Sequence, residues 1–463
     1  LILLCVVITK LFSYNFLMKT VIKPPVAILG FGVEGQYALD FLKTQKISDI
    51  TICDENESVE IPKNAKSQLG SKAFKDLKAF RTIIRSPGVH YRLPGILEAR
   101  KAGCTVTSMT ELTLEQAANR MTAITGSNGK TTTVAMLDKI LTAHYKGKII
   151  VGGNDRTPVL QEAIKRPNEL ILMEVSSFQF ADIKMSPHIA AVLNITPNHL
   201  DWHENLEEYA NAKSNLIAHQ SYLDWCILNR NDENSSRLGK KTPGKIFWLG
   251  TDEGNDWATW KGDKLVAKFE DKEATILSKK DITIKTHPDN ILCAIAVSLI
   301  HRVTPTLIKE QLAKFVGAEH RLEFVKEVEG VKFYNDSACT TPESTKVAIN
   351  EFPEGKLILL LGGSSKNADF SFLAHDIIEH RVRPYLYGKE GPRIQEAIKA
   401  EDEYYPIMML DESDDFPAIV IRALEMAQPG DNIVLSPACA SFDMFKNAKD
   451  RGKQFKEIVK NLD

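Results

Sequence analysis

The sequence is poor in cysteine, and its few cysteines are scattered. There are 7 among 463 residues, an odd number, and no C-x-x-C pair occurs. They are Cys5, Cys53, Cys104, Cys226, Cys293, Cys339 and Cys439. This pattern argues against a disulfide framework and against a structural zinc site, and it is typical of a reducing compartment. We therefore expect a cytoplasmic location.

The sequence also lacks a surplus of either charge. Lys and Arg total 58 against 60 Asp and Glu, a net charge of -2. A dominant nucleic-acid surface would need a basic excess, so we predict no nucleic-acid partner. Hydrophobic residues make up 43% and charged residues 25%, as in ordinary globular proteins. At roughly 150 residues per domain, the length predicts about three domains.

No apolar run is long enough to cross a membrane. Residues 1–17 (LILLCVVITKLFSYNFL) are apolar, but Lys10 interrupts them, and they are shorter than the roughly 20 residues that a span needs. A basic segment before the run and a small-residue cleavage site, the marks of a secretory signal, are missing too. We expect residues 1–17 to be an upstream extension outside the fold, with no stable membrane insertion.

Short apolar runs alternate with helix-like stretches along the rest of the chain, which predicts an α/β protein with mostly parallel sheets. The expected strands are Val26–Leu29, Ile50–Cys53, Thr82–Ile84, Thr122–Thr125, Leu170–Val175, Ala190–Asn194, Trp225–Leu228, Lys356–Leu361, Pro384–Tyr387 and Asn432–Leu435. The stretch from Lys245 to Ile284 has alternating runs instead, which suggests a small antiparallel addition. We place domain boundaries near residues 108 and 317.

A glycine-containing turn joins the strand before residue 126 to a helix. It reads Gly126, Ser127, Asn128, Gly129, Lys130, Thr131, Thr132. Glycines let backbone amides approach phosphate oxygens, the lysine would neutralise them, and the Thr131 hydroxyl would bind Mg²⁺. The first glycine of the full G-x-x-x-x-G-K-[ST] pattern would fall at Ile124, so the match is imperfect. The turn predicts an ATP or GTP site.

A second glycine-rich turn follows the first expected strand. It reads Gly30, Phe31, Gly32, Val33, Glu34, Gly35, and Asp54 ends the next strand. Taken alone, this pattern predicts NAD binding and a nicotinamide-dependent oxidoreductase. It also suits any nucleotide diphosphate, and it can serve strand–helix packing without a ligand. The segment Ser86, Pro87, Gly88 is a plausible companion loop.

Three polar residues downstream suit metal and acyl-transfer chemistry. Glu174 and the segment leading to His199 lie at the ends of apolar strands, where open α/β sheets place ligands. Glu174 could hold Mg²⁺, and His199 could be a second ligand or could position substrate. The structural alternatives are a helix cap for Glu174 and a surface lysine for Lys213.

These residues, taken together, resemble the Mur ligase family over residues 18–463. The shared motifs are T-G-S-N-G-K-T-T at 125–132, E-V-S-S-F-Q at 174–179, N-x-x-x-x-H-L-D at 194–201, H-R at 320–321, N-D-S at 335–337, L-G-G-S-S-K-N-A-D-F at 361–370 and L-S-P-A-C-A-S-F-D-M-F-K-N at 435–447. The last two point to the D-glutamate-adding members.

The resemblance implies three α/β domains. These are a Rossmann-like parallel sheet (18–108), a P-loop ATPase-type domain with the antiparallel addition (109–317) and a second Rossmann-like domain (318–463). It also implies an ATP-dependent amide ligase that joins D-glutamate to UDP-N-acetylmuramoyl-L-alanine in the cytoplasmic stage of peptidoglycan synthesis. The acid would react through an acyl phosphate and a tetrahedral intermediate. We expect a monomer.

The resemblance also assigns roles to residues. Lys130, Glu174, His199 and Lys213 would be catalytic, and Thr131, Glu174, His199 and Lys213 would serve two Mg²⁺ ions, with Lys213 as a carbamate. ATP would contact the 126–132 loop together with Asn290, Arg321 and Asp336. The UDP substrate would contact residues 30–35, Asp54, residues 86–88 and Asn154. D-Glutamate would contact Thr340, Lys366, Ser441 and Phe442.

Some positions depart from the family's pattern. A family lysine is replaced by Ala338, an expected aromatic residue by Ala448, and the segment Thr286–Asn290 keeps only its last asparagine. Two further alternatives therefore stay open beside the oxidoreductase. One is a non-catalytic nucleotide-binding relative, and the other is a ligase of the same family with a different amino acid.

Overall fold

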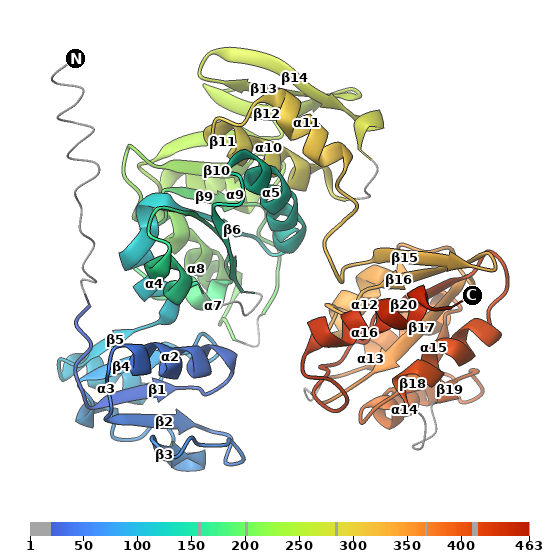
Figure 1. Ribbon diagram of the computed structural model, residues 1–463, viewed down its shortest axis with the longest axis horizontal. Coiled ribbons are helices and arrows are strands. Elements are labelled where there is room, and N and C mark those ends of the chain that lie inside the picture. Colours follow the sequence, from blue (N-terminus) through green and yellow to red (C-terminus); the bar gives the residue numbers. More distant parts are fainter. Residues whose placement is uncertain are drawn as a thin grey trace. The chain divides into compact units, whose positions relative to one another are not determined.

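The computed structural model describes residues 20–154, 159–199, 202–282, 286–365, 368–409 and 415–462. The expected extension 1–17 and Lys366 lie outside these residues. The chain divides into two compact units between Phe315 and Val316 (Figure 1). The six cysteines within the described residues are free thiols. Among the same residues, no helix has both the length and the apolar character that a membrane span requires.

The first unit begins with a five-stranded, all-parallel sheet in the order β3-β2-β1-β4-β5. Its strands are β1 (Val26–Leu29), β2 (Ile50–Asp54), β3 (Lys66–Leu69), β4 (Thr82–Arg85) and β5 (Thr105–Thr107), and its helices are α2 (Val33–Thr44) and α3 (Pro94–Lys101). Both faces of β1 are buried, Val26 and Ile28 in one apolar cluster and Ala27 and Leu29 in another. A strand covered on both sides reads as a continuous apolar run, which is why the sequence predicted it.

A nine-stranded sheet follows, in the order β14-β13-β12-β11-β10-β9-β6-β8-β7. Its strands are β6 (Met121–Thr125), β7 (Ile149–Gly153), β8 (Leu170–Glu174), β9 (Ile189–Val192), β10 (Trp225–Asn229), β11 (Lys245–Leu249), β12 (Asp256–Lys261), β13 (Lys264–Phe269) and β14 (Lys272–Ser278). The helices are α4 (Met109–Ala117), α5 (Lys130–His144), α6 (Leu160–Lys165), α7 (Ser177–Phe180), α8 (Leu206–Ala218), α9 (Glu233–Arg237), α10 (Pro288–Ile300) and α11 (Pro305–Ala313).

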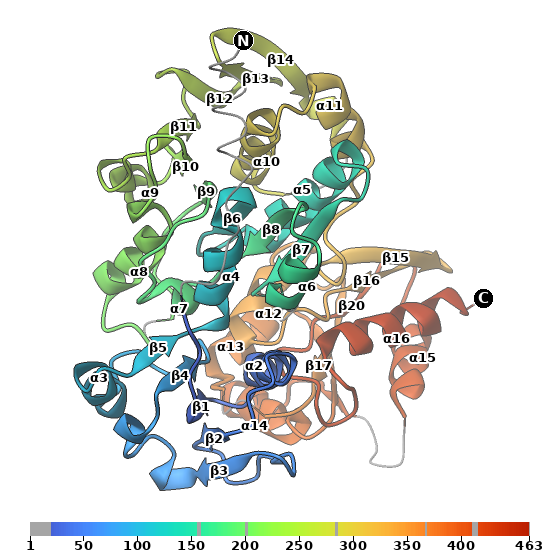
Figure 2. The ribbon, with the colours of Figure 1, turned by 60° about the vertical axis from the view of Figure 1, so that its left-hand side comes forward.

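Helices cover both faces of this central sheet (Figures 1 and 2). Alternate residues of β6 point to opposite sides: Ile124 packs in the cluster that includes α5 and α10, whereas Ala123 packs in the one that includes α4 and α8. This layering leaves the strand ends uncovered, and the 126–129 loop and Glu174 lie at the ends of β6 and β8.

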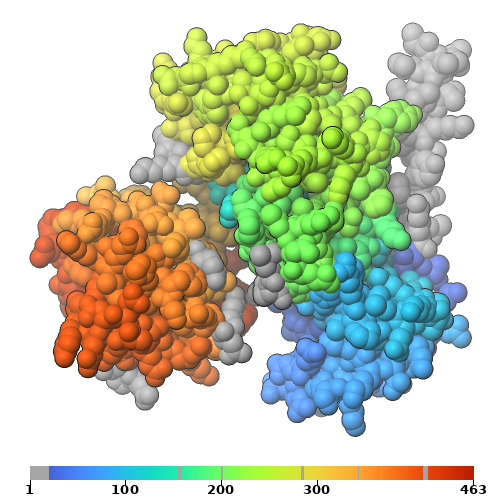
Figure 3. All heavy atoms as spheres, turned by 180° about the vertical axis from the view of Figure 1, so that it is seen from behind, coloured from blue at the N-terminus to red at the C-terminus, as the bar shows by residue number. Residues whose placement is uncertain are grey.

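The antiparallel addition is confirmed for β12, β13 and β14, which pair antiparallel in succession. They lie at the end of the first unit away from the N-terminal sheet (Figure 3). The expectation that the addition starts at Lys245 is wrong, because β11 pairs parallel with β10. Phe247 and Leu249 of β11 are fully buried, so this strand extends the parallel core before the chain turns back.

The second unit is a six-stranded sheet in the order β15-β16-β20-β17-β18-β19. Its strands are β15 (Glu323–Val328), β16 (Val331–Asn335), β17 (Leu357–Gly362), β18 (Arg383–Tyr387), β19 (Met408–Met409) and β20 (Asn432–Leu435). Its helices are α12 (Pro342–Ile349), α13 (Ser371–Glu379), α14 (Gly391–Glu401), α15 (Phe416–Glu425) and α16 (Ala448–Lys460). Only the β15–β16 pair is antiparallel among these described strands. The predicted α/β class is therefore confirmed.

Candidate active site

The phosphate loop connects the end of β6 to the start of α5. Gly129 has a φ of +84°, and a Cβ there would lie 2.1 Å from Asn290 Oδ1, so only glycine fits without a shift. Lys130 Nζ donates hydrogen bonds to the carbonyls of Gly126 (2.9 Å) and Ser127 (3.0 Å). The loop is thus folded around the lysine that the sequence singled out, and Asn290 lies directly against it.

Neighbouring side chains hold the loop in shape. The Asn128 amide donates to Asn194 Oδ1 at 2.8 Å, and Asn194 Nδ2 returns a bond to the Asn128 carbonyl at 3.1 Å. The Ser127 hydroxyl donates to the Thr196 carbonyl at 2.9 Å and lies 3.0 Å from the Tyr209 hydroxyl. Asn194 and Thr196 follow β9, so the neighbouring strand of the sheet supports the loop.

An oxygen-rich cluster lies beside the first turn of α5. Thr131 Oγ1 donates to Glu174 Oε2 at 2.8 Å, and Asn154 Nδ2 donates to Glu174 Oε1 at 3.1 Å. Glu174 ends β8 and is only 6% exposed. Carboxylate, hydroxyl and amide oxygens beside a phosphate loop are the kind of ligand that Mg²⁺ prefers. These residues therefore fit the ion that the sequence predicted, and Thr132 lies next to them in the same turn.

Lys213 is buried, which rules out the surface-lysine alternative. It is 2% exposed, and its Nζ donates to the Gly126 carbonyl at 3.0 Å and to Thr125 Oγ1 at 3.3 Å. Burial and the nearby Lys130 charge lower the pKa of Lys213 well below its usual value, whereas Glu174 opposes the shift. An amine in this position is neutral far more readily than one in water.

His199 lies in a cluster of aromatic rings that sequence reasoning missed. Its ring centroid is 4.8 Å from that of Phe178 and 6.5 Å from that of Tyr209. His203, 1% exposed, packs in the same cluster with its Nε2 2.9 Å from Ser177 Oγ. Burial lowers the pKa of His203 to about 4. No spacing rule pointed to His203, because its partners come from a separate segment of the chain.

Asn290 is fixed by a hydrogen bond to the residues that precede its own helix, α10. Its Nδ2 donates to Thr286 Oγ1 at 3.0 Å. The preceding residue, Asp289, accepts hydrogen bonds from Asn229 (2.7 Å) and Asn231 (2.9 Å), and the sequence gave no sign of this network. It fixes the start of α10 against the end of β10, and so fixes Asn290 against the phosphate loop.

The N-terminal glycine turn is also built around a close backbone approach. A Cβ at Gly35 would lie 2.2 Å from the Gly30 carbonyl oxygen. Asp54 Oδ2 accepts from the Phe31 amide at 2.6 Å, and Ser86 Oγ donates to the Gly30 carbonyl at 2.7 Å. The turn, Asp54 and the Ser86 loop therefore come together as predicted from their sequence positions. Gly32 precedes helix α2, which begins at Val33.

Glu34 of this turn has an unusual environment for an acid. Burial raises the pKa of Glu34 to about 7, although the nearby Arg85 charge opposes the shift. Arg85 is itself buried, donates to the carbonyls of Pro87 (3.4 Å) and Val89 (2.8 Å), and pairs with Asp182 at 2.7 Å. The loop that holds Pro87 and Gly88 is thereby tied to the central domain within the first unit.

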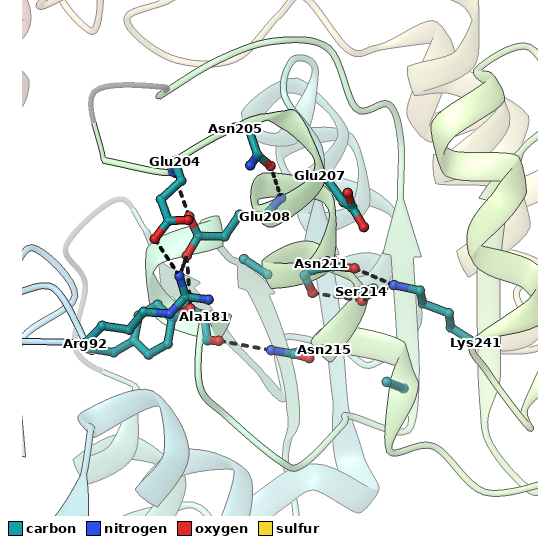
Figure 4. Close-up of a pocket in the computed structure, with 13 residues that line it drawn as sticks. Arg92, Ala181, Glu204, Asn205, Glu207, Glu208, Asn211, Ser214, Asn215 and Lys241 are labelled. Atoms are coloured by element: carbon teal, nitrogen blue, oxygen red, sulfur yellow. Dashed lines mark hydrogen bonds and ion pairs between the residues drawn. The ribbon is translucent and has the colours of Figure 1, made fainter. Parts of the chain in front are cut away.

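A polar groove of about 560 Å³ lies on the outer side of α8. Figure 4 shows Arg92 reaching Glu204 and Glu208 at one end and Lys241 reaching Asn211 and Ser214 at the other. None of the residues predicted for the site lines this groove. Lys213, on the same helix, is buried instead toward the phosphate loop.

In the second unit, Asp336 and Thr340 follow β16, Ser441 and Phe442 follow β20, and Arg321 precedes β15. Asp336 is 2% exposed; its Oδ2 accepts from Ser436 Oγ at 2.7 Å and its Oδ1 from the Leu322 amide at 3.1 Å. Burial raises the pKa of Asp336 to about 6. Arg321 precedes Leu322, so Asp336 helps to fix the segment that carries this arginine.

The loop after β20 carries Ser441 and Phe442. Ser441 is buried, whereas Phe442 is 58% exposed, and the Phe442 amide donates to Ser364 Oγ at 3.0 Å. Ser364, after β17, also forms a β-bridge with Ala440. Thr340 lies on the loop after β16, the strand next to β20. These residues therefore share one edge of the sheet.

Three family models match the chain in succession: the Mur ligase MurD-like N-terminal domain over residues 24–108, the Mur ligase middle domain over 124–297 and the Mur ligase glutamate ligase domain over 320–439. The UDP-N-acetylmuramoylalanine--D-glutamate ligase of Acetivibrio thermocellus is 34% identical, covering 97% of this chain and 99% of the relative. The ligase of the same name from Symbiobacterium thermophilum is 32% identical, covering 94% and 98%.

Solved structures agree in fold. The UDP-N-acetylmuramate-alanine ligase MurC of Thermotoga maritima aligns with a TM-score of 0.52 at 15% identity, covering 94% of this chain and 99% of that chain. FolC of E. coli, in complex with DHPP and ADP, aligns with a TM-score of 0.53 at 12% identity, covering 76% and 92%. With its domains, motif order and full-length relatives in agreement, the chain belongs to the Mur ligase family.

Proposed function

We propose that the protein is an ATP-dependent ligase that adds D-glutamate to UDP-N-acetylmuramoyl-L-alanine. The observation that carries this proposal is the full-length similarity to relatives bearing that activity in their name. The cluster of Lys130, Thr131 and Glu174 at one phosphate loop supports it, since these are the groups that phosphoryl transfer needs. The departures at Ala338 and Ala448 lie away from this cluster in the sequence.

A carboxylate is a poor electrophile, so the acid must first gain a leaving group. The proposed sequence transfers the γ-phosphoryl group of ATP to the L-alanine carboxylate and releases ADP. The D-glutamate amine then attacks the acyl carbon, and the tetrahedral intermediate loses phosphate to leave the amide. Lys130 and the backbone amides of the 126–132 loop would bind the triphosphate, and Lys130 would offset charge on the transferred group.

In this proposal Thr131 and Glu174 would hold one Mg²⁺ for the ATP phosphates, and His199 and Lys213 would serve a second for the acyl group. Such ions would supply positive charge that lets anionic reactants approach one another. Lys213 would act as a carbamate: its neutral Nζ attacks CO₂, loses a proton and gains a carboxylate. The lowered pKa of Lys213 supports this step, because only the neutral amine is nucleophilic.

The other predicted residues divide between the substrates. The 30–35 turn, Asp54 and the 86–88 loop would bind the UDP end through amides and a helix N-terminus, and Asn154 would serve the acyl side. Asn290, Arg321 and Asp336 would contact adenine, phosphate and ribose. Thr340, Lys366, Ser441 and Phe442 would form the D-glutamate pocket, with the Lys366 ammonium opposite a carboxylate. We further propose domains at 18–108, 109–317 and 318–463, a monomer and a cytoplasmic location.

The test is ADP release measured with each substrate omitted in turn. We expect turnover only when UDP-N-acetylmuramoyl-L-alanine, D-glutamate, ATP and Mg²⁺ are all present, with the amide product found by mass spectrometry. Turnover with L-lysine or a folate in place of D-glutamate would refute the substrate assignment. Absence of turnover with every amino acid tried would refute the ligase itself.

A further inference from the structure

Arg451, in the first turn of α16, is fully buried and joins two loops of the second unit. Its Nε donates to Ser337 Oγ at 2.9 Å, and its terminal nitrogens donate to the carbonyls of Ser337 (3.0 Å), Cys439 (3.2 Å) and Ala440 (3.3 Å). All four acceptors are neutral oxygens. A buried cation is costly unless its donors are satisfied, so this arrangement constrains both loops strongly.

The two loops that Arg451 joins are those that carry the proposed D-glutamate contacts. Ser337 lies between Asp336 and Thr340 after β16, whereas Cys439 and Ala440 directly precede Ser441 after β20. Other direct links run from the Ala438 amide to the Cys339 carbonyl (3.2 Å) and from Ser436 Oγ to Asp336 Oδ2 (2.7 Å), and the Asp336 amide donates to the Leu435 carbonyl at the end of β20 (2.8 Å). The Arg451 guanidinium donates hydrogen bonds to both loops and so strengthens the polar connection between them.

Arg451 also ties these loops to its own helix. Ser337 Oγ, which accepts from Arg451 Nε, donates in turn to the Ala448 carbonyl at 2.7 Å. A planar guanidinium with five donors in fixed geometry can serve acceptors on both loops at once, which a lysine ammonium on a flexible stem does less well. In addition, its permanent charge lies behind loops that are proposed to receive an amino acid with two carboxylates, and charges interact more strongly where water is excluded.

We infer that Arg451 is a positioning residue that sets the affinity for the acidic amino-acid substrate by fixing the Thr340 and Ser441 loops relative to each other. This inference rests on the proposed function, since it assigns the role to the same D-glutamate pocket. Arg451 contacts no substrate in this account. It acts through the backbone carbonyls that precede Ser441 and through Ser337.

The test compares steady-state kinetics of the full chain with those of Arg451→Met and Arg451→Lys. We expect Arg451→Met to raise the KM for D-glutamate about tenfold or more, as for the loss of several hydrogen bonds from a charged donor, while the KM for the UDP substrate stays unchanged. Arg451→Lys keeps the positive charge but loses the planar set of donors. The KM for D-glutamate of this variant should therefore lie between those of Arg451→Met and the unsubstituted protein.

Phe455→Leu is the matched control. Phe455 is also fully buried, one turn further along α16, and its ring packs against that of Phe333 in β16. This variant should lower the melting temperature without changing the KM for D-glutamate. An unchanged KM in Arg451→Met, or an equal rise in Phe455→Leu, would overturn the inference.

A variant that keeps Arg451 guards against misfolding of Arg451→Met. Ser337→Ala removes the side-chain acceptor of Nε together with the hydroxyl that donates to the Ala448 carbonyl. A several-fold rise in the KM for D-glutamate, smaller than in Arg451→Met, is expected for the loss of these two hydrogen bonds. No rise there would also count against the inference. If the unsubstituted protein makes no amide with D-glutamate, the proposed function fails first, so the two failures are distinguishable.

Discussion

The two glycine turns of the first unit share a backbone design but differ in the side chains around them. In both, a strand leads through glycine into a helix, and an added Cβ would collide, 2.2 Å from the Gly30 carbonyl at Gly35 and 2.1 Å from Asn290 Oδ1 at Gly129. The N-terminal turn is held by the acid Asp54, whereas the central loop is folded around Lys130. Backbone amides suffice to bind a diphosphate, but moving a phosphoryl group also requires a cation and a metal-binding acid.

The largest expected difference between the turns concerns Lys130. Lys130→Ala should lower kcat by roughly a thousandfold or more, because it removes the charge that is proposed to stabilise the transferred phosphoryl group. ADP release under saturating substrates measures the effect. Lys139→Ala, an exposed position on the same helix, should behave like the unsubstituted protein. Near-normal kcat in Lys130→Ala would show that the central loop does not differ from the N-terminal turn in function.

Lys213 should show the next largest effect. Lys213→Ala should lower kcat by about a hundredfold, as for loss of a group that supports a metal, and short carboxylic acids such as acetate should restore part of it. The reason is that a free carboxylate could take the place of the carboxylate of the proposed carbamate. Lys241→Ala, whose ammonium lies in the polar groove outside α8, is the control and should not respond. A folded Lys213→Ala protein that acids never rescue would contradict the carbamate.

Alanine at each tight glycine should separate the two proposed nucleotide sites. Gly129→Ala pushes Asn290 away from the phosphate loop and should raise the KM for ATP about tenfold, a cost of about 1.4 kcal/mol. Gly35→Ala should instead raise the KM for the UDP substrate and leave that for ATP unchanged. Steady-state kinetics with one substrate varied at a time give both values. If both variants altered the same KM, the assignment of one nucleotide to each turn would be wrong.

Glu34 gives the smallest effect, and it concerns stability. Its pKa is about 7 in the folded protein against a reference of 4.5, so the folded state favours the protonated acid. The stability that protonation provides is complete below pH 4.5 and is lost as the pH rises through 7. The melting temperature of Glu34→Gln relative to that of the unsubstituted protein should therefore rise by about 2–4 °C between pH 5 and pH 8. An equal difference in melting temperature between Glu34→Gln and the unsubstituted protein at pH 5 and at pH 8 would contradict the raised pKa of Glu34.

The exposed Glu55, which follows Asp54, provides the control for this comparison. Glu55→Gln should leave the difference in melting temperature the same at pH 5 and at pH 8. A pH-dependent gap in this variant would mean that the effect comes from net charge and not from the burial of Glu34.

Local pattern predicted the apolar strands well, because a strand buried on both faces leaves an uninterrupted apolar run. β1 begins and ends at the predicted residues Val26 and Leu29, whereas the polar edge strand β3 (KSQL) left no signal. Helix α2 starts at Val33, inside the glycine turn of residues 30–35. The turn itself, whose last residues form the first turn of the helix, obscured that boundary.

The candidate active site also contains features that local sequence patterns predicted and features that they did not. The phosphate loop and the strand-end Glu174 follow from short motifs. The burial of Lys213, the His203–Ser177 contact and the clamp by Arg451 depend on segments that are distant in sequence, so no local pattern could reveal them. The N-terminal turn shows that a short motif can also mislead, since its pattern taken alone predicted a nicotinamide cofactor.

The transfer of ¹⁸O from substrate to phosphate tests the central claim most directly. UDP-N-acetylmuramoyl-L-alanine labelled with ¹⁸O in its terminal carboxylate would be converted with ATP, Mg²⁺ and D-glutamate, and the released phosphate analysed by mass spectrometry. Activation of the acid by the γ-phosphoryl group predicts one ¹⁸O atom in each phosphate formed, because the carboxylate oxygen leaves with phosphorus. Amide formation with unlabelled phosphate would contradict the account.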